Sequence, residues 1–227
     1  LGSVAGLDVV HLQCHIGTDT VSLAKLGARV TGLDFSPAAL REARALAARA
    51  DVEVRFVESE LYEAPVALGA TYDLVYTGVG ALNWLPDIAR WARVVAALLR
   101  PSGRLHLREG HPVLWSLADP RPDGVLAIEY PYFETSQPSM FEQPGTYVHT
   151  DRQLVHNRTY EWNHGLGEIV TALLDAGLTL RLLVEHDSVP WDAQPGLMDA
   201  LPGGELRLRD RPERLPHSYT LQAVKQA

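Results

Sequence analysis

The chain has 227 residues, 46% of them hydrophobic, which is enough for one sizeable core but hardly for two. Its formal net charge of −8 argues against nucleic acid as a partner, because binding to phosphates needs clustered Lys and Arg. The single cysteine, Cys14, excludes a disulfide framework and a cysteine-rich zinc site, which favours the cytoplasm. No apolar run reaches the roughly 20 residues of a membrane-spanning helix, so we expect no membrane partner.

The first half alternates short β-branched runs with helical patterns, as is typical of strand and helix units in a parallel sheet. Five segments are predicted as buried strands: 7–12, 29–34, 52–57, 72–77 and 103–108. Helices are expected at 18–26, from Pro37 behind a capping Ser36, and over 88–99, where apolar residues recur every three or four positions.

The predicted single domain, residues 1–227, has three parts. Residues 1–110 form a cofactor-binding half. From 111 to 160 the periodicity fails and Pro and aromatic residues accumulate, which predicts a substrate-covering insertion with some strand content. Residues 161–227 return to regular structure, with a helix closed by Gly177 and two final strands at 178–185 and 218–224 that complete the sheet.

The stretch 9–34 indicates a strand, a turn, a helix and a second strand that ends in Asp34. A carboxylate at that tip can accept both hydroxyls of a ribose, and the turn offers N–H groups and a helix N-terminus to the rest of a cofactor. The dinucleotide fingerprint G-x-G-x-x-G is absent, because Gln13 and His15 stand at two of its positions before Gly17. A domain without a nucleotide, with Asp34 as a solvated strand end, remains an alternative.

Acidic residues also follow the third strand, where Glu58 and Glu60 lie close together. A carboxylate suits the exocyclic amine of adenine but repels a pyrophosphate, which favours an adenosyl cofactor over NAD. A solvated turn is the alternative interpretation of both residues.

Five segments in order resemble the motifs of class I S-adenosylmethionine-dependent methyltransferases: VVHLQCHIG, TGLDFSPAAL, FVESELYEAP, YDLVYTGVGALNWL and LLRPSGRLHL. CHIGTDT and YEWNHGLGEI are similar to segments of a bacterial subgroup of stand-alone small-molecule enzymes. The first motif departs from the family pattern, since His11 replaces its acidic residue and Gln13 and His15 replace two glycines.

The resemblance implies an α/β fold, a Rossmann-like doubly wound sheet of seven strands in the order 3-2-1-4-5-7-6 with the last strand antiparallel. It also implies an N-terminal lid segment before Leu1, which we expect to be missing from this chain. The implied reaction moves a methyl group from S-adenosylmethionine to a small organic acceptor, aromatic or heteroaromatic, and releases S-adenosylhomocysteine. The cofactor-binding residues carried over are Gln13, Cys14, His15, Gly17, Thr18, Asp19, Thr20, Asp34, Phe35, Ser36, Glu60, Leu61, Thr77, Gly78 and Val79.

Methyl transfer from a sulfonium mainly requires positioning and exclusion of water, so no metal is expected. His111, just past the fifth strand, is the first candidate for a proton-accepting base, although it could be structural ahead of Pro112. His164 is the second candidate, with capping or a cofactor-side hydrogen bond as its alternative.

An aromatic acceptor pocket is predicted from Trp84, Trp115, Tyr130, Tyr132, Phe133, Tyr160 and Trp162, with loop packing as the alternative. Two other functions stay open: an adenosyl-binding module without catalysis, and a nicotinamide-dependent oxidoreductase. The sequence leaves the acceptor atom and the oligomeric state undetermined.

Overall fold

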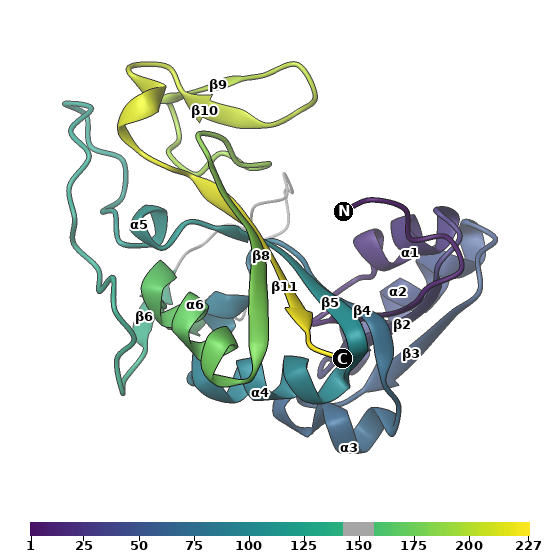
Figure 1. Cartoon of the computed structure of the whole chain (residues 1–227). Helices are drawn as coiled ribbons and strands as arrows, with labels where there is room; N and C mark the ends of the chain where they lie inside the picture. The colour runs from purple at the N-terminus through teal and green to yellow at the C-terminus, as the bar shows by residue number, and fades with distance from the viewer. Residues whose placement is uncertain (143–156) are drawn as a thin grey trace.

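The computed structural model describes residues 1–142 and 157–227, in which a seven-stranded twisted sheet forms the centre (Figure 1). Its strands are β1 (Asp8–Leu12), β2 (Arg29–Asp34), β3 (Val54–Glu58), β4 (Tyr72–Thr77), β5 (Leu99–Gly110), β8 (Leu178–His186) and β11 (Ser218–Lys225). They lie in the order β3-β2-β1-β4-β5-β11-β8, and β11 runs antiparallel to both of its neighbours. Numbered along the chain this order is 3-2-1-4-5-7-6, so the predicted sheet is confirmed.

Helices cover the two faces of this sheet. Helices α1 (Thr18–Lys25) and α2 (Pro37–Arg49) lie on one face, whereas α3 (Ala64–Leu68), α4 (Ile88–Leu98) and α6 (Leu166–Asp175) lie on the other (Figure 1). The largest apolar cluster lies under α4 and α6, where Trp91 is fully buried against the sheet. The predicted start of α2 is confirmed, because the Ser36 hydroxyl accepts a hydrogen bond from the Ala39 N–H at 3.2 Å.

Most predicted strands match within two residues, but two details were wrong. Strand β5 begins at Leu99 rather than 103 and therefore follows α4 directly. Strand β3 was predicted to be buried, yet its side chains are half-buried or exposed. As the edge strand it has a neighbour on one side only, so its β-branched run indicated a strand without indicating burial.

The segment 111–160 begins with a short helix, α5 (Pro112–Trp115), and ends in a small hairpin. Strands β6 (Ser139–Glu142) and β7 (Arg158–Glu161) pair antiparallel there, so the predicted strand content is present. Residues 143–156 of this predicted insertion lie outside the described residues.

No sequence pattern indicated a further unit at 187–217. It contains the two-stranded pair β9 (Met198–Ala200) and β10 (Leu206–Leu208) and the 3₁₀ turn η3 (Pro212–Arg214). Two other 3₁₀ turns, η1 (Leu61–Glu63) and η2 (Leu82–Trp84), lie in the first half of the chain. The 187–217 unit shares an apolar cluster with Leu114 and Leu117, and Trp191 stacks on Trp115 with ring centroids 5.6 Å apart. It lies apart from the sheet at the top of Figure 1.

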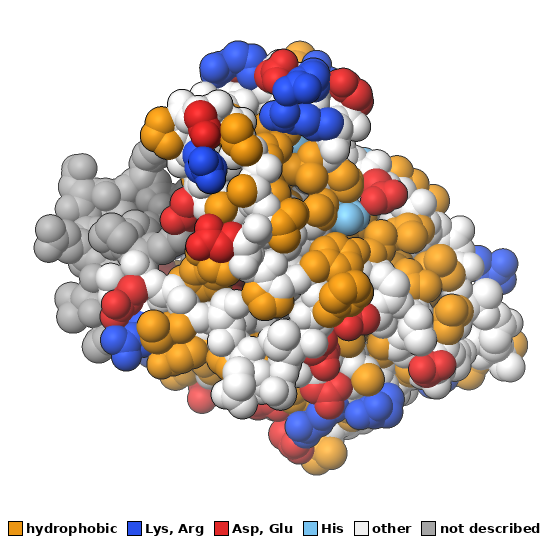
Figure 2. Space-filling view, turned by 90° about the vertical axis from the view of Figure 1, so that its left-hand side faces the viewer, with side chains coloured by type: hydrophobic (Ala, Val, Ile, Leu, Met, Phe, Trp, Pro, Cys, Tyr) orange, Lys and Arg blue, Asp and Glu red, His pale blue; other side chains and the backbone are white. Residues whose placement is uncertain are grey.

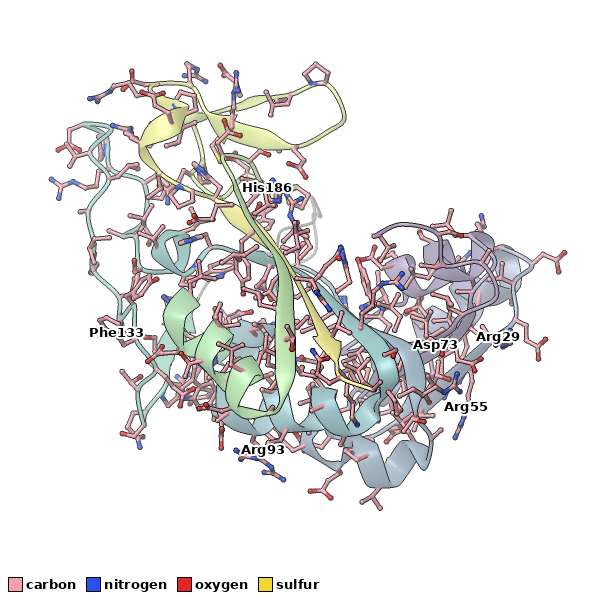
Figure 3. All side chains as sticks on the ribbon, in the orientation of Figure 1. Arg29, Arg55, Asp73, Arg93, Phe133 and His186 are labelled. Atoms are coloured by element: carbon pink, nitrogen blue, oxygen red, sulfur yellow. The ribbon has the colours of Figure 1, made fainter. Side chains whose placement is uncertain are left out.

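Ion pairs fix the edge of the sheet at which the parallel strands begin. Arg29 and Arg100 contact Asp8 at 2.6 and 2.8 Å, and Arg100 also contacts Asp73 at 2.8 Å. Arg29 and Asp73 lie at this same edge in Figure 3. The hydrogen bond from Arg29 is the largest cause that lowers the pKa of Asp8.

Among the described residues, no helix is long and apolar enough to cross a membrane. The same residues contain no cluster of three His, Cys, Asp or Glu side chains that could hold a metal ion.

Candidate cofactor and acceptor site

The turn between β1 and α1 has an unusual backbone. Gln13, His15 and Gly17 all have left-handed conformations, with φ values of 54°, 50° and 76°. Glycine adopts this region freely, whereas other residues are strained there by about 1–3 kcal/mol. A Cβ at Gly17 would also lie 2.9 Å from the Ala43 Cβ, so the last position requires glycine. The turn thus keeps the shape of a glycine-rich loop although two glycines are replaced.

Hydrogen bonds from neighbouring elements hold this turn. The Gln13 side chain donates to the Ala81 carbonyl at 3.0 Å, and the Cys14 N–H donates to the Leu33 carbonyl at 2.9 Å. Burial raises the pKa of the Cys14 thiol to about 12. Cys14 is therefore a packed thiol in the floor of the turn, with its backbone close to the predicted cofactor position.

Asp34 lies at the tip of β2 and is only 7% exposed, unlike a solvated strand end. One carboxylate oxygen accepts the His15 N–H at 2.8 Å and the other accepts the Ser36 N–H at 2.9 Å. Each oxygen retains a further lone pair, which can accept a hydroxyl group. Asp34 thus joins the two loops and can also bind a sugar.

Two large apolar side chains at the same edge are exposed. Phe35 follows Asp34 and is 73% exposed, and Ile16 lies within the β1 turn at 38%. Thr18 beside them is also exposed. Together they offer apolar surface that the flat face of a nucleobase could cover.

The third predicted motif is arranged differently from the expectation. The Glu60 carboxylate accepts the Tyr62 N–H at 2.8 Å and caps η1, while the side chain of Leu61 is buried in the core. Neither side chain projects freely toward the strand tips. Contact between these two residues and an adenine stays a prediction.

The loop after β4 carries the predicted residues Thr77, Gly78 and Val79. Thr77 is fully buried, and its hydroxyl has no hydrogen-bond partner among the described residues. Gly78 lies opposite the first turn of α1, since a Cβ there would be 3.2 Å from the Asp19 carboxylate.

Glu109, at the end of β5, fixes the rest of this loop and was not predicted as a site residue. Its buried carboxylate accepts N–H groups from Gly80, Ala81 at 2.8 Å, Leu82 at 3.0 Å and Gly110 at 2.7 Å. Burial raises the pKa of Glu109, and these N–H groups oppose that shift. A single acidic residue at the end of a strand whose other charged residues are arginines was the available signal.

His111 uses both ring nitrogens within the fold. The Val113 N–H donates to Nδ1 at 3.2 Å, so Nε2 carries the hydrogen and donates to Glu185 at 2.9 Å. Burial lowers the pKa of His111, which keeps the ring neutral. Action as a proton acceptor, the role predicted from the sequence, would require one of these contacts to break.

His164 is also enclosed, at 2% exposure. Its Nε2 lies 2.8 Å from the Leu85 carbonyl and 3.2 Å from that of Leu82, and its Nδ1 lies 2.8 Å from the Glu134 carboxylate. The ring therefore connects the loop after η2 to the start of α6. Capping of α6 belongs to Glu168, whose carboxylate accepts the Gly165 N–H at 2.6 Å.

A small cavity of about 10 Å³, room for about one water-sized group, lies below the tips of β4 and β5. It is lined by Leu82, Asn83, Glu109, Gly110, Pro112, Trp115, Trp162, Asn163, His164, Ile169 and Tyr219. Three of its walls contain a buried polar atom without a partner among the described residues: Asn83 Oδ1, Trp162 Nε1 and the Tyr219 hydroxyl. Such atoms suit the binding of a polar group, because unpaired buried polar atoms are costly. The sequence missed Asn83 and Tyr219.

The structure brings only part of the predicted aromatic set to this cavity. Trp115 and Trp162 line it, whereas Trp84 is 47% exposed on η2 and donates to the Gly80 carbonyl. The remaining aromatic residues do not line it. Tyr130 packs edge-on against Phe141, Tyr132 packs against Phe133 and Gly165, and Tyr160 pairs with Met140 across the hairpin.

Phe133 lies at the outer edge of the molecule, 67% exposed (Figure 3). Figure 2 shows hydrophobic side chains gathered near the middle of this side, with charged groups toward its upper and lower edges. A role of these outer aromatic residues in acceptor binding stays a prediction.

The fold is shared by known methyltransferases. A solved S-adenosylmethionine-dependent methyltransferase from Mesorhizobium loti superposes with a TM-score of 0.66 at 24% identity, covering 99% of this chain and 94% of that one. Magnesium protoporphyrin IX methyltransferase from Synechocystis PCC 6803, solved with bound S-adenosylmethionine, gives a TM-score of 0.55 at 18% identity over 99% and 73% of the two chains. The architecture is thus the Rossmann-like methyltransferase fold.

Sequence comparison finds methyltransferases over the first half of the chain. The family described as "Methyltransferase domain" matches residues 10–105. Ubiquinone biosynthesis O-methyltransferase from Methylobacterium sp. (strain 4-46) is 39% identical over 100 residues, 44% of this chain and 39% of the relative. The enzyme of that name from Vibrio campbellii is 35% identical over 102 residues, 45% and 43% of the two chains. The chain spans about two fifths of these curated relatives. Residues 10–105 are therefore similar to a methyltransferase domain.

Proposed function

We propose that the chain binds S-adenosylmethionine at the tips of β1, β2 and β4 and transfers its methyl group to a small organic acceptor. The observation that carries this proposal is the strained turn after β1, where Gln13 and His15 keep a left-handed backbone beside Asp34. Strain of this kind persists where the surrounding structure enforces it, and it concentrates at ligand sites. The identity with curated methyltransferases supports the same chemistry.

The residues present fit the cofactor. The Asp34 carboxylate has lone pairs for the ribose, Phe35 and Ile16 offer exposed apolar surface for the base, and the start of α1 has no side-chain cap on its N–H groups. When bound, the cofactor supplies a methyl group that is already activated by its sulfonium. The chain therefore mainly has to orient the acceptor and exclude water.

We further propose an aromatic or heteroaromatic acceptor that carries one polar group. Trp115 and Trp162 supply flat apolar walls in the cavity below Gly110, and Asn83 and Tyr219 supply unpaired polar atoms. The cavity itself, about 10 Å³, has room for one water-sized group, so it would take the polar group of a small acceptor and not its ring. The curated relatives are named as O-methyltransferases, so a hydroxyl group is a reasonable first target.

The test is transfer of labelled methyl from S-adenosylmethionine to a panel of phenols, catechols and hydroxylated heteroaromatic compounds. We expect labelled product together with stoichiometric S-adenosylhomocysteine. Binding of S-adenosylhomocysteine without transfer to any acceptor would instead indicate a binding module. Binding and reduction of a nicotinamide cofactor would indicate an oxidoreductase.

A further inference from the structure

The carboxylates near the proposed cofactor site differ in what they already bind. Asp34 accepts one backbone N–H group on each oxygen, and Glu109 accepts four such groups. Both charges hold loops in place. A third carboxylate, Asp19, does not have this role.

Asp19 is the second residue of α1 and is half-buried. One of its oxygens, Oδ2, accepts the Tyr76 hydroxyl at 3.0 Å, and Oδ1 has no hydrogen-bond or ion-pair partner among the described residues. The same Oδ2 would lie 3.2 Å from a Cβ at Gly78, which places the carboxylate against the turn after β4. Asp19 therefore presents a negative charge between the tips of β1 and β4.

The neighbouring strand position does not supply such a charge. His11 on β1 has its Nδ1 2.8 Å from the Thr20 hydroxyl and packs edge-on against Tyr76, with ring centroids 4.9 Å apart. Burial lowers the pKa of His11 to about 4, so this ring is neutral near pH 7. The tip of β1 thus lacks the acidic group that the similar methyltransferase motif has at the position of His11.

We propose that Asp19 binds the ammonium group at the amino-acid end of the adenosyl cofactor, so that the anchoring carboxylate comes from α1 rather than from β1. This inference rests on the proposed function. The ammonium is a strong donor, and the carboxylate against Gly78 provides a charged acceptor for it. The uncapped N–H groups at the start of α1 favour the cofactor's carboxylate nearby. Asp19 and α1 together recognise both charges of the zwitterion.

The test compares two ligands that differ only at this end. S-adenosylhomocysteine has the amino-acid group, whereas 5′-methylthioadenosine lacks it but keeps the nucleoside. In calorimetric titrations, Asp19→Asn should lower the affinity for S-adenosylhomocysteine about 10- to 100-fold, as expected for the loss of a charged hydrogen bond. The affinity for 5′-methylthioadenosine should change less than threefold. Tyr76→Phe, which removes the group that orients Asp19, should give a smaller loss of the same selectivity.

Asp175→Asn is the matched control, because Asp175 is exposed at the end of α6. Its affinities and melting temperature should equal those of the wild type. Equal losses for both ligands in Asp19→Asn, or no loss for either, would overturn the assignment while leaving the proposed function intact. A wild-type protein that binds neither ligand would overturn both.

Discussion

Glu109 is the side chain whose replacement should most disturb the site's scaffold. Each of its carboxylate oxygens accepts two backbone N–H groups, from Gly80 and Gly110 on one and from Ala81 and Leu82 on the other. In Glu109→Gln one oxygen becomes an NH₂ group, so two buried N–H donors lose their acceptor. At about 1–3 kcal/mol for each unsatisfied donor, the free energy of unfolding should fall by roughly 2–6 kcal/mol.

Thermal unfolding followed by circular dichroism measures this loss. A loss of about 4 kcal/mol should lower the melting temperature by roughly 8–16 °C in a chain of this size. Glu42→Gln, on the exposed side of α2, is the control and should change it little. A Glu109→Gln protein that melts within about 2 °C of the wild type would show that the carboxyl group is already neutral, and would refute the four-donor arrangement.

Three further outcomes are expected. Burial lowers the pKa of His106 to about 4, so between about pH 6.5 and 4 the unfolded state binds more protons and stability falls as pH falls. At pH 4.5 the protonation of this histidine lowers the free energy of unfolding by about 2.5 kcal/mol. His106→Gln should remove this contribution from the pH dependence measured by urea unfolding, and an unchanged pH dependence would contradict the buried, neutral state of His106. Asp34→Ala should lower the calorimetric affinity for S-adenosylhomocysteine at least tenfold, and an unchanged affinity would contradict the assignment of Asp34 to the ribose. Gly110→Ala would place a Cβ 2.6 Å from the Trp115 ring and should cost about 1–3 kcal/mol in denaturant unfolding, whereas wild-type stability would mean that Trp115 moves freely.

The sheet and the cofactor edge could be predicted because their signals are local. Each strand is a short apolar run, and the side chains at its tip follow it directly in the sequence, as Asp34 follows β2. Parallel strands bring those tips to one edge, so sequence order alone places Gln13, Asp34 and Gly78 together.

The acceptor cavity and the 187–217 unit depend on contacts that sequence patterns do not contain. Asn83 and Trp162 are joined by a backbone hydrogen bond of 2.8 Å, and Tyr219 reaches them because β11 inserts between β5 and β8. Strands β9 and β10 have three residues each, too short for a periodic signal, and tertiary packing such as the stacking of Trp191 on Trp115 holds them.

A variant of His111 distinguishes proton transfer in the reaction from a purely structural role. A base must offer a free lone pair, but Nδ1 of His111 accepts the Val113 N–H and Nε2 donates to Glu185. We therefore expect His111→Gln to lower stability by about 1–3 kcal/mol through its lost contacts, and to change the single-turnover rate less than tenfold. The assay is methyl transfer across pH with the acceptor found in the labelled-methyl screen, beside a titration of S-adenosylhomocysteine. If His111 transfers a proton, His111→Gln should instead lower the single-turnover rate roughly 10²- to 10⁴-fold. The pH profile of the rate should then lack one inflection, while the cofactor affinity stays normal. That result would show that the contact with Glu185 breaks when the acceptor binds.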